Sequence, residues 1–209
     1  RLLMSDYTIE EFYEIIKLHG ITSKQGKKFL TSWNDIRANL NCPFFGNRWD
    51  DLESRRPMTR DFYEHLLTKP SGFMTKAAKD ILNDPLLDKE EKKKLTTADH
   101  VLSGQTWGTF VIAKYEELFE DNFSAYVKEC LTASQTVVST VEENNRFKDF
   151  TINDETTGGT LRLRVPTENR YEAAGITKLW DSNNGKYVTE FPFELSDEFL
   201  DFQKEYLLI

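Results

Sequence analysis

The chain has 209 residues, a net charge of −8, 39% hydrophobic residues and 13% aromatic residues. This length and composition exclude an intrinsically disordered chain and favour one folded domain, or one domain with a small appendage. Two cysteines, Cys42 and Cys130, are too few for a disulfide framework or for a zinc site by themselves.

Helix signals follow one another along the first two thirds of the chain. Thr8 and Glu11 have capping-box spacing, and Gly20 supplies a stop, which predicts a first helix. Apolar residues at helical spacing predict a second helix from about Ser23 to Leu40. The same criteria predict further helices after Thr59, over 71–82, over 88–95, from Ser103, over 123–131 and from Thr140.

The periodicity changes after residue 160. Leu161, Leu163 and Val165 alternate with arginines, which predicts a strand. Segments 176–181 and 186–191 flank an Asn-Gly turn, the strongest short hairpin pattern, and Ser196 then caps a last helix. We therefore predict a mainly α fold of the α+β class, with a helical domain over 1–150. A small antiparallel sheet with its hairpin and a terminal helix would occupy 151–209.

The charge is divided unevenly along the chain. Residues 101–209 carry 10 basic and 19 acidic side chains, whereas the segment 17–60 has nine basic and four acidic ones with aromatic residues between them. A basic and aromatic stretch inside an acidic chain is typical of a surface that meets phosphates and bases. No apolar stretch reaches the length of a membrane span and no signal-peptide pattern is present, so we expect a soluble cytoplasmic protein with no membrane partner.

The first two predicted helices resemble a helix-turn-helix, with Gly20 in the tight turn. In such a unit the second helix enters the major groove, so Lys24, Lys27 and Lys28 would contact DNA. Two positions depart from the pattern, because a small residue is usual at Ile16 and a branched apolar one at Gly26. The alternative is an ordinary helical hairpin with solvated lysines.

A second basic group follows in the predicted loop and the helix after it. Its members are Arg48, Arg55, Arg56 and Arg60, and Trp49 could stack on bases. They form a candidate phosphate clamp, or surface arginines paired with the neighbouring acidic residues.

Candidate catalytic groups come from two places. Asp61 and His65 are four residues apart on one predicted helix, which suits two ligands of one metal ion. Asp99-His100, with a distal Asn144-Asn145-x-x-Lys148, resembles the histidine–asparagine nucleases over residues 99–148. The resemblance implies that a histidine activates water while a divalent metal stabilises the leaving oxygen. It departs from that family, which places a hairpin after its histidine, where residues 107–118 here predict a helix. The alternative is that His100 caps or packs at a helix entrance.

Two functional hypotheses follow. The first is a DNA-binding protein that acts through residues 20–60, and that could be an endonuclease using Mg²⁺ or Mn²⁺ with Asp61, His65, Asp99 and His100. The second is a non-enzymatic helical module without a cofactor, whose acidic half binds a basic protein partner; a homo-oligomer is compatible with either. No glycine-rich nucleotide-binding motif and no nucleophile elbow is present, so Rossmann and α/β-hydrolase enzymes have no support.

Overall fold

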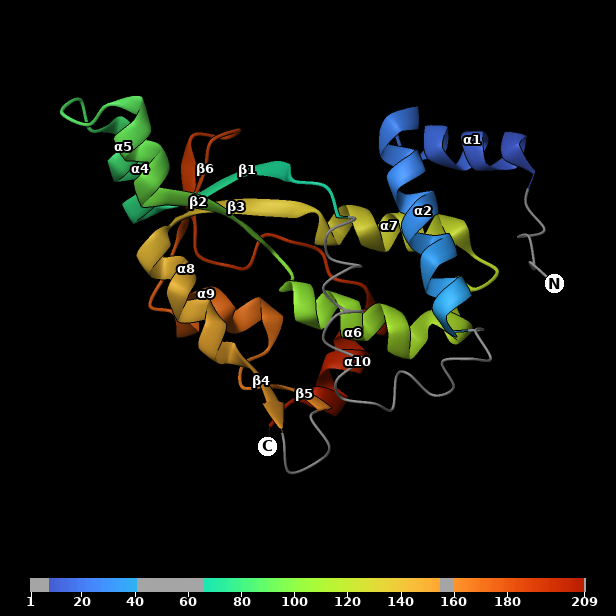
Figure 1. Cartoon of the computed structure of the whole chain (residues 1–209). Coiled ribbons are helices and arrows are strands. Elements are labelled where there is room, and N and C mark those ends of the chain that lie inside the picture. Colours follow the sequence, from blue (N-terminus) through green and yellow to red (C-terminus); the bar gives the residue numbers. More distant parts are fainter. Residues whose placement is uncertain (1–7, 41–65, 155–159, 209) are drawn as a thin grey trace.

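The computed structural model describes residues 8–40, 66–154 and 160–208 (Figure 1). A five-stranded mixed sheet with the strand order β2-β3-β1-β6-β7 joins distant segments of the chain. β1 (Lys69–Thr75) runs parallel to β3 (Gln135–Thr140), and β2 (Thr96–His100) runs antiparallel to β3. β6 (Leu179–Asp181) lies antiparallel to β1 and forms a hairpin with β7 (Lys186–Val188).

One set of helices, which we call the helical lobe, packs around an aromatic core away from this sheet (Figure 1). Its elements are α1 (Ile9–Leu18), α2 (Ser23–Leu40), α6 (Gly104–Lys114), the π-helical turn η1 (Tyr115–Phe119), α7 (Phe123–Ala133) and α10 (Asp197–Tyr206). Trp33, Trp107 and Phe110 are fully buried in this core. Burial of such large side chains supplies most of the hydrophobic stabilisation of the lobe.

The five-stranded sheet and the short helices beside it form the sheet lobe, with a second hydrophobic core of its own that includes Val101, Phe147 and Tyr171. The short elements are α4 (Lys76–Asn83), α5 (Lys89–Leu95), α8 (Val141–Phe147), η2 (Lys148–Phe150), η4 (Thr167–Asn169) and α9 (Arg170–Ala173). A separate two-stranded sheet, β4 (Thr151–Asp154) and β5 (Thr160–Leu163), connects to the end of α10 through a bridge between Leu163 and Leu207.

Local capping patterns place most helices correctly. The reciprocal capping bonds of Thr8 with Glu11, and of Thr140 with Glu143, are both formed, and Ser103 and Ser196 cap α6 and α10. The β6–β7 hairpin turns at Gly185, whose φ of +64° is the left-handed conformation that glycine tolerates. The α+β class and these elements are confirmed. No helix within the described ranges has the length and hydropathy needed to cross a bilayer.

The predicted position of the sheet is wrong. Instead of a small C-terminal antiparallel sheet, the main sheet is mixed and central, because β1, β2 and β3 come from residues 69–140. The helix predicted over 71–82 begins only at Lys76, and Phe73 and Met74 lie in β1. The helical spacing of their side chains is overridden by backbone pairing with β3 and β6.

Candidate nucleic-acid interface

The α1–α2 unit is a compact helix pair with a tight turn. Ile21 donates its backbone N–H to Ile16, and Gly20 has a φ of +64°. Thr22 then caps α2 reciprocally, because Gln25 N donates to Thr22 Oγ1 and Thr22 N donates to Gln25 Oε1. The sequence Thr22-x-x-Gln25 therefore fixes where α2 begins.

Ile16 and Gly26 pack directly against each other where α1 crosses α2. Ile16 is 4% exposed, and a Cβ atom added at Gly26 would overlap its side chain. The two departures from the helix-turn-helix pattern are thus complementary, since the large residue on α1 fills the space beside the glycine on α2. The two helices still approach closely, because the large side chain lies on α1 and the small residue on α2, the reverse of the usual pattern.

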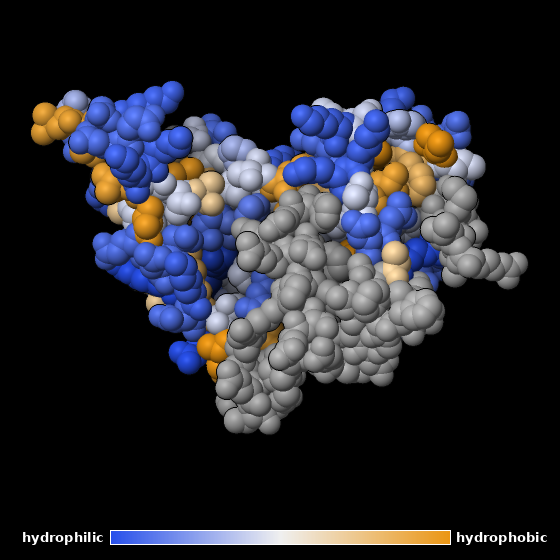
Figure 2. All heavy atoms as spheres, viewed as in Figure 1, coloured by the Kyte–Doolittle hydropathy of each residue, from blue (hydrophilic) through white to orange (hydrophobic). Residues whose placement is uncertain are grey.

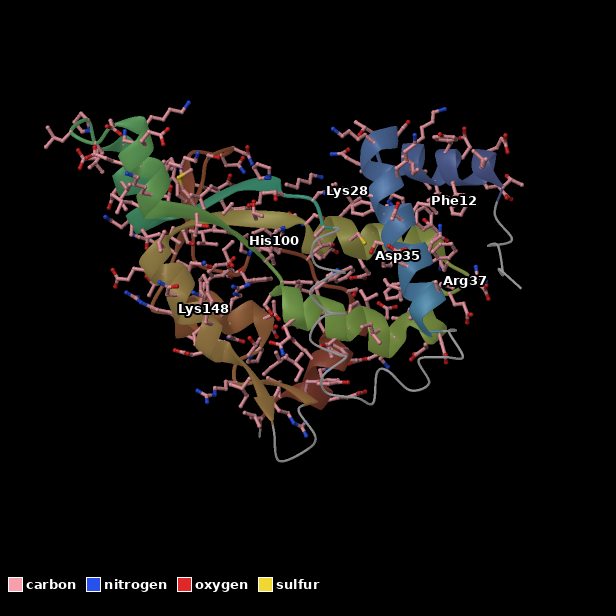
Figure 3. All side chains as sticks on the ribbon, viewed as in Figure 1. Phe12, Lys28, Asp35, Arg37, His100 and Lys148 are labelled. Carbon is pink, nitrogen blue, oxygen red and sulfur yellow. The ribbon has the colours of Figure 1, made fainter. Side chains whose placement is uncertain are left out.

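The opposite face of α2 carries its lysines. Lys24, Lys27 and Lys28 are exposed, whereas Phe29 and Trp33 are fully buried. Figure 3 shows Lys28 on the other side of α2 from Phe12. No described residue forms an ion pair with these three lysines. The first two turns of α2 therefore present a positively charged surface to the solvent.

Specific contacts fix α1 and α2 to the rest of the helical lobe. Trp33 donates its indole Nε1 to the Phe119 carbonyl at 2.9 Å, and Ser32 Oγ is 2.6 Å from the hydroxyl of Tyr126. His19 Nε2 lies 2.9 Å from Ser124 Oγ on α7, and burial lowers the pKa of His19. The lysines are thus carried on a helix that buried hydrogen bonds hold in place.

Seven of the predicted site residues lie in the segment 41–65, outside the described residues: Arg48, Trp49, Arg55, Arg56, Arg60, Asp61 and His65. The phosphate clamp and the Asp61–His65 metal pair therefore stay predictions. The described candidates are the three lysines of α2 and the pair Asp99-His100.

Asp99 and His100 end strand β2, and Arg170 binds both of them. The Arg170 guanidinium lies 2.7 Å from the Asp99 carboxylate and donates to the carbonyls of His100 and Val101 at 2.8 and 2.7 Å. It also lies 4.3 Å from the centre of the Phe147 ring. Burial raises the pKa of Asp99, and Arg170 and His100 offset part of that rise. His100 donates from Nε2 to the Leu67 carbonyl at 2.9 Å.

The strand that carries His100 has an antiparallel partner, which bears on the resemblance to the histidine–asparagine nucleases. Residues 107–118 are helical as predicted, yet β2 does have an antiparallel partner, β3, which comes after α7. α8 follows β3, packs on both strands and carries Asn145, whose Oδ1 accepts from Lys148 Nζ at 2.6 Å. The histidine strand is therefore paired, with a helical insertion between the two strands.

A divalent ion at Asp99 would compete with Arg170 for the same carboxylate. The described residues hold no group of three or more His, Cys, Asp or Glu side chains arranged to bind a metal. The described part of the predicted catalytic set thus does not fit a metal site unless Arg170 moves. Arg170 was not predicted as a site residue, because its partners lie about 70 residues earlier in the chain.

No known protein family, curated protein or solved structure matches the chain. Any functional assignment must therefore come from the residues and geometry described above.

Proposed function

We propose that the protein binds double-stranded DNA through the first two turns of α2. The observation that carries this proposal is the exposed row of Lys24, Lys27 and Lys28 on a helix whose other face is buried. Lysines at the start of a fixed helix suit phosphates and base edges in the major groove.

The surface beside α2 is hollowed and polar. Figure 2 shows a hollow between the projection formed by α1 and α2 and the projection formed by α4 and α5, with hydrophilic side chains on both sides. The acidic remainder of the chain repels a polyanion, so attraction is confined to the basic positions.

The test is the salt dependence of affinity for a mixed-sequence duplex in EDTA. Replacing Lys24, Lys27 and Lys28 together with Ala should weaken binding at least tenfold. It should also reduce the slope of log K against log salt by about 1 per lysine that contacts a phosphate. The matched control replaces Arg164, Lys186 and Lys204, three exposed basic residues elsewhere, and removes the same charge. Equal losses in both triple variants, or no DNA binding at low salt, would refute the proposal.

A metal-dependent nuclease is the second candidate, and the β2–β3–α8 arrangement is the observation that favours it. It places His100 on a paired strand with Asn145 on the following helix. Adding Mg²⁺ or Mn²⁺ to the bound plasmid tests it, because nicking that EDTA abolishes would identify an enzyme.

A further inference from the structure

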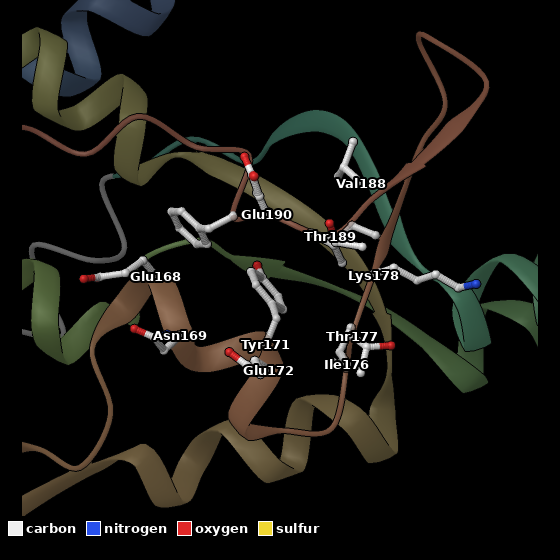
Figure 4. A pocket seen from close by; sticks show the side chains of 12 residues that line it. Glu168, Asn169, Tyr171, Glu172, Ile176, Thr177, Lys178, Val188, Thr189 and Glu190 are labelled. Carbon is white, nitrogen blue, oxygen red and sulfur yellow. The ribbon is translucent and has the colours of Figure 1, made fainter.

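A cavity of about 490 Å³ lies between the segment 168–172 and the β6–β7 hairpin. This volume falls within the range of small-ligand sites. Five of its lining residues are apolar or aromatic: Tyr171, Ile176, Leu179, Val188 and Phe191. Figure 4 shows the Tyr171 side chain in the middle of the ring of lining residues. The cavity can therefore shelter an apolar group.

The charged lining residues are mostly acidic. Glu168, Glu172 and Glu190 line the cavity, and Lys178 is its one basic lining residue. The Lys178 ammonium lies 4.5 Å from the centre of the Tyr187 ring, and Figure 4 shows it pointing away from Tyr171. The Glu168 carboxylate accepts from Gln203 Nε2 at 2.7 Å, and Figure 4 shows it pointing away from Tyr171. Glu172 and Glu190 are therefore the nearest carboxylates for a cation, while Lys178 contacts the Tyr187 ring.

The Tyr171 hydroxyl is the second observation. Tyr171 is 5% exposed, and its hydroxyl has no hydrogen-bond partner among the described residues. Burial raises the pKa of this phenol, so it stays neutral and keeps both a donor and an acceptor. Its ring is held edge-on by Phe147 at 5.5 Å and lies 6.1 Å from Phe191. A buried hydroxyl normally has a partner, and this one is covered by protein atoms in the free protein, so a ligand reaches it only when the side chains above it move aside.

We propose that this cavity binds an organic cation, an ammonium or guanidinium group carried on an apolar stem. The cationic N–H groups would donate to the surrounding carboxylates, and to the Tyr171 hydroxyl once the side chains that cover it have moved, while the stem lies against Ile176 and Phe191. Aromatic faces add attraction for the cation. This site is independent of DNA binding, because its charge is opposite to that of the α2 surface.

The experiment is a titration of the full chain with phenethylammonium, followed by NMR or calorimetry, beside the neutral isostere phenethyl alcohol. The cation should bind saturably and at least tenfold more tightly than the alcohol. Tyr171→Phe should weaken the cation several-fold. The triple change Glu168→Gln, Glu172→Gln and Glu190→Gln should remove at least 90% of the affinity.

The matched control changes three exposed glutamates elsewhere, Glu10, Glu90 and Glu116, to Gln and should leave binding unchanged. Equal affinity for alcohol and amine, or equal losses in both triple variants, would overturn the proposal. N-acetyl-lysine methylamide distinguishes the source of the cation. If it binds as tightly as phenethylammonium, the site accepts a side chain of a basic protein; if only the free amine binds, the site serves a small molecule.

Discussion

The side chain of Ile16 fills the space that a side chain at position 26 would occupy. Gly26→Val should therefore destabilise the protein by about 1–3 kcal/mol through overpacking, even though Val forms helices better than Gly. Ile16→Ala should cost about 2–5 kcal/mol through the cavity it leaves. The double variant should be more stable than the sum of the two costs implies, since each change relieves the other. Urea unfolding of the four proteins measures this coupling, and strict additivity would show that the two residues do not touch.

Arg170 is a buried charged residue of the sheet lobe, and we expect its removal to lower the free energy of unfolding strongly. Arg170→Met leaves Asp99 buried without its cation and two carbonyls without their donor, which should cost about 3–5 kcal/mol near pH 7. The cost should shrink at low pH. Without Arg170 the pKa of Asp99 rises further, and a group with a raised folded-state pKa loses stability as the pH increases through that value.

Urea unfolding of this variant at pH 7 and at pH 4 checks the prediction, because the raised pKa of Asp99 favours its protonation as the pH falls. Arg146→Met is the control. Arg146 is exposed, pairs with Glu142 on its own helix and donates to the Ala174 carbonyl at 3.0 Å. Its loss leaves no buried charge unpaired and should cost about 1–2 kcal/mol at either pH. A cost for Arg170→Met that does not depend on pH would mean that Asp99 is not the group left unpaired.

Tyr171→Phe should stabilise the free protein by about 1 kcal/mol, because it removes a buried hydroxyl that lacks a partner. Tyr126→Phe makes the same chemical change where the hydroxyl does have a partner, Ser32 Oγ at 2.6 Å, and should destabilise by about 1–3 kcal/mol. Thermal and urea unfolding compare the two variants. If Tyr171→Phe is as harmful as Tyr126→Phe, the Tyr171 hydroxyl is bonded in the free protein.

His100→Gln tests the nuclease candidate separately from DNA binding. Glutamine keeps an N–H that can reach the Leu67 carbonyl but cannot accept a proton in catalysis. If His100 is a general base, cleavage of bound plasmid in Mg²⁺ should fall by about 10²–10⁴-fold with unchanged affinity. His19→Gln, a change to a histidine bonded to Ser124, is the control and should cleave normally. Normal cleavage by His100→Gln would give His100 a structural role only.

Local chemistry explains which parts of the fold were predictable from the sequence. Helix starts depend on residues three apart, so the boxes at Thr8 and Thr140 were visible, and Asn184-Gly185 identified the hairpin. The strands β1, β2 and β3 were missed, because each runs directly into a helix or turn and is defined by pairing with segments far away in the chain.

The candidate site residues also divide into those that local sequence predicts and those that it does not. The exposure of Lys24, Lys27 and Lys28 was predictable from Phe29 and Trp33, which mark the buried face of the same helix. The Arg170–Asp99 pair and the Tyr171 cavity were not, because they depend on how α9 meets β2 and the hairpin. Only the three-dimensional arrangement brings such residues together.

The insertion of α6, η1 and α7 between β2 and β3 also has a consequence for the order of folding. Pairing His100 with Thr136 closes a loop of more than 30 residues, which an unstructured chain would close at a high entropic cost. If α6 and α7 have already folded back on each other, they hold the two ends of the insertion, Ser103 and Ser134, in place. The loop that remains to be closed is then shorter, and its entropic cost is lower. We therefore expect the helical lobe to act as the nucleus on which the central sheet assembles, with sheet amides losing hydrogen-exchange protection whenever the helices open.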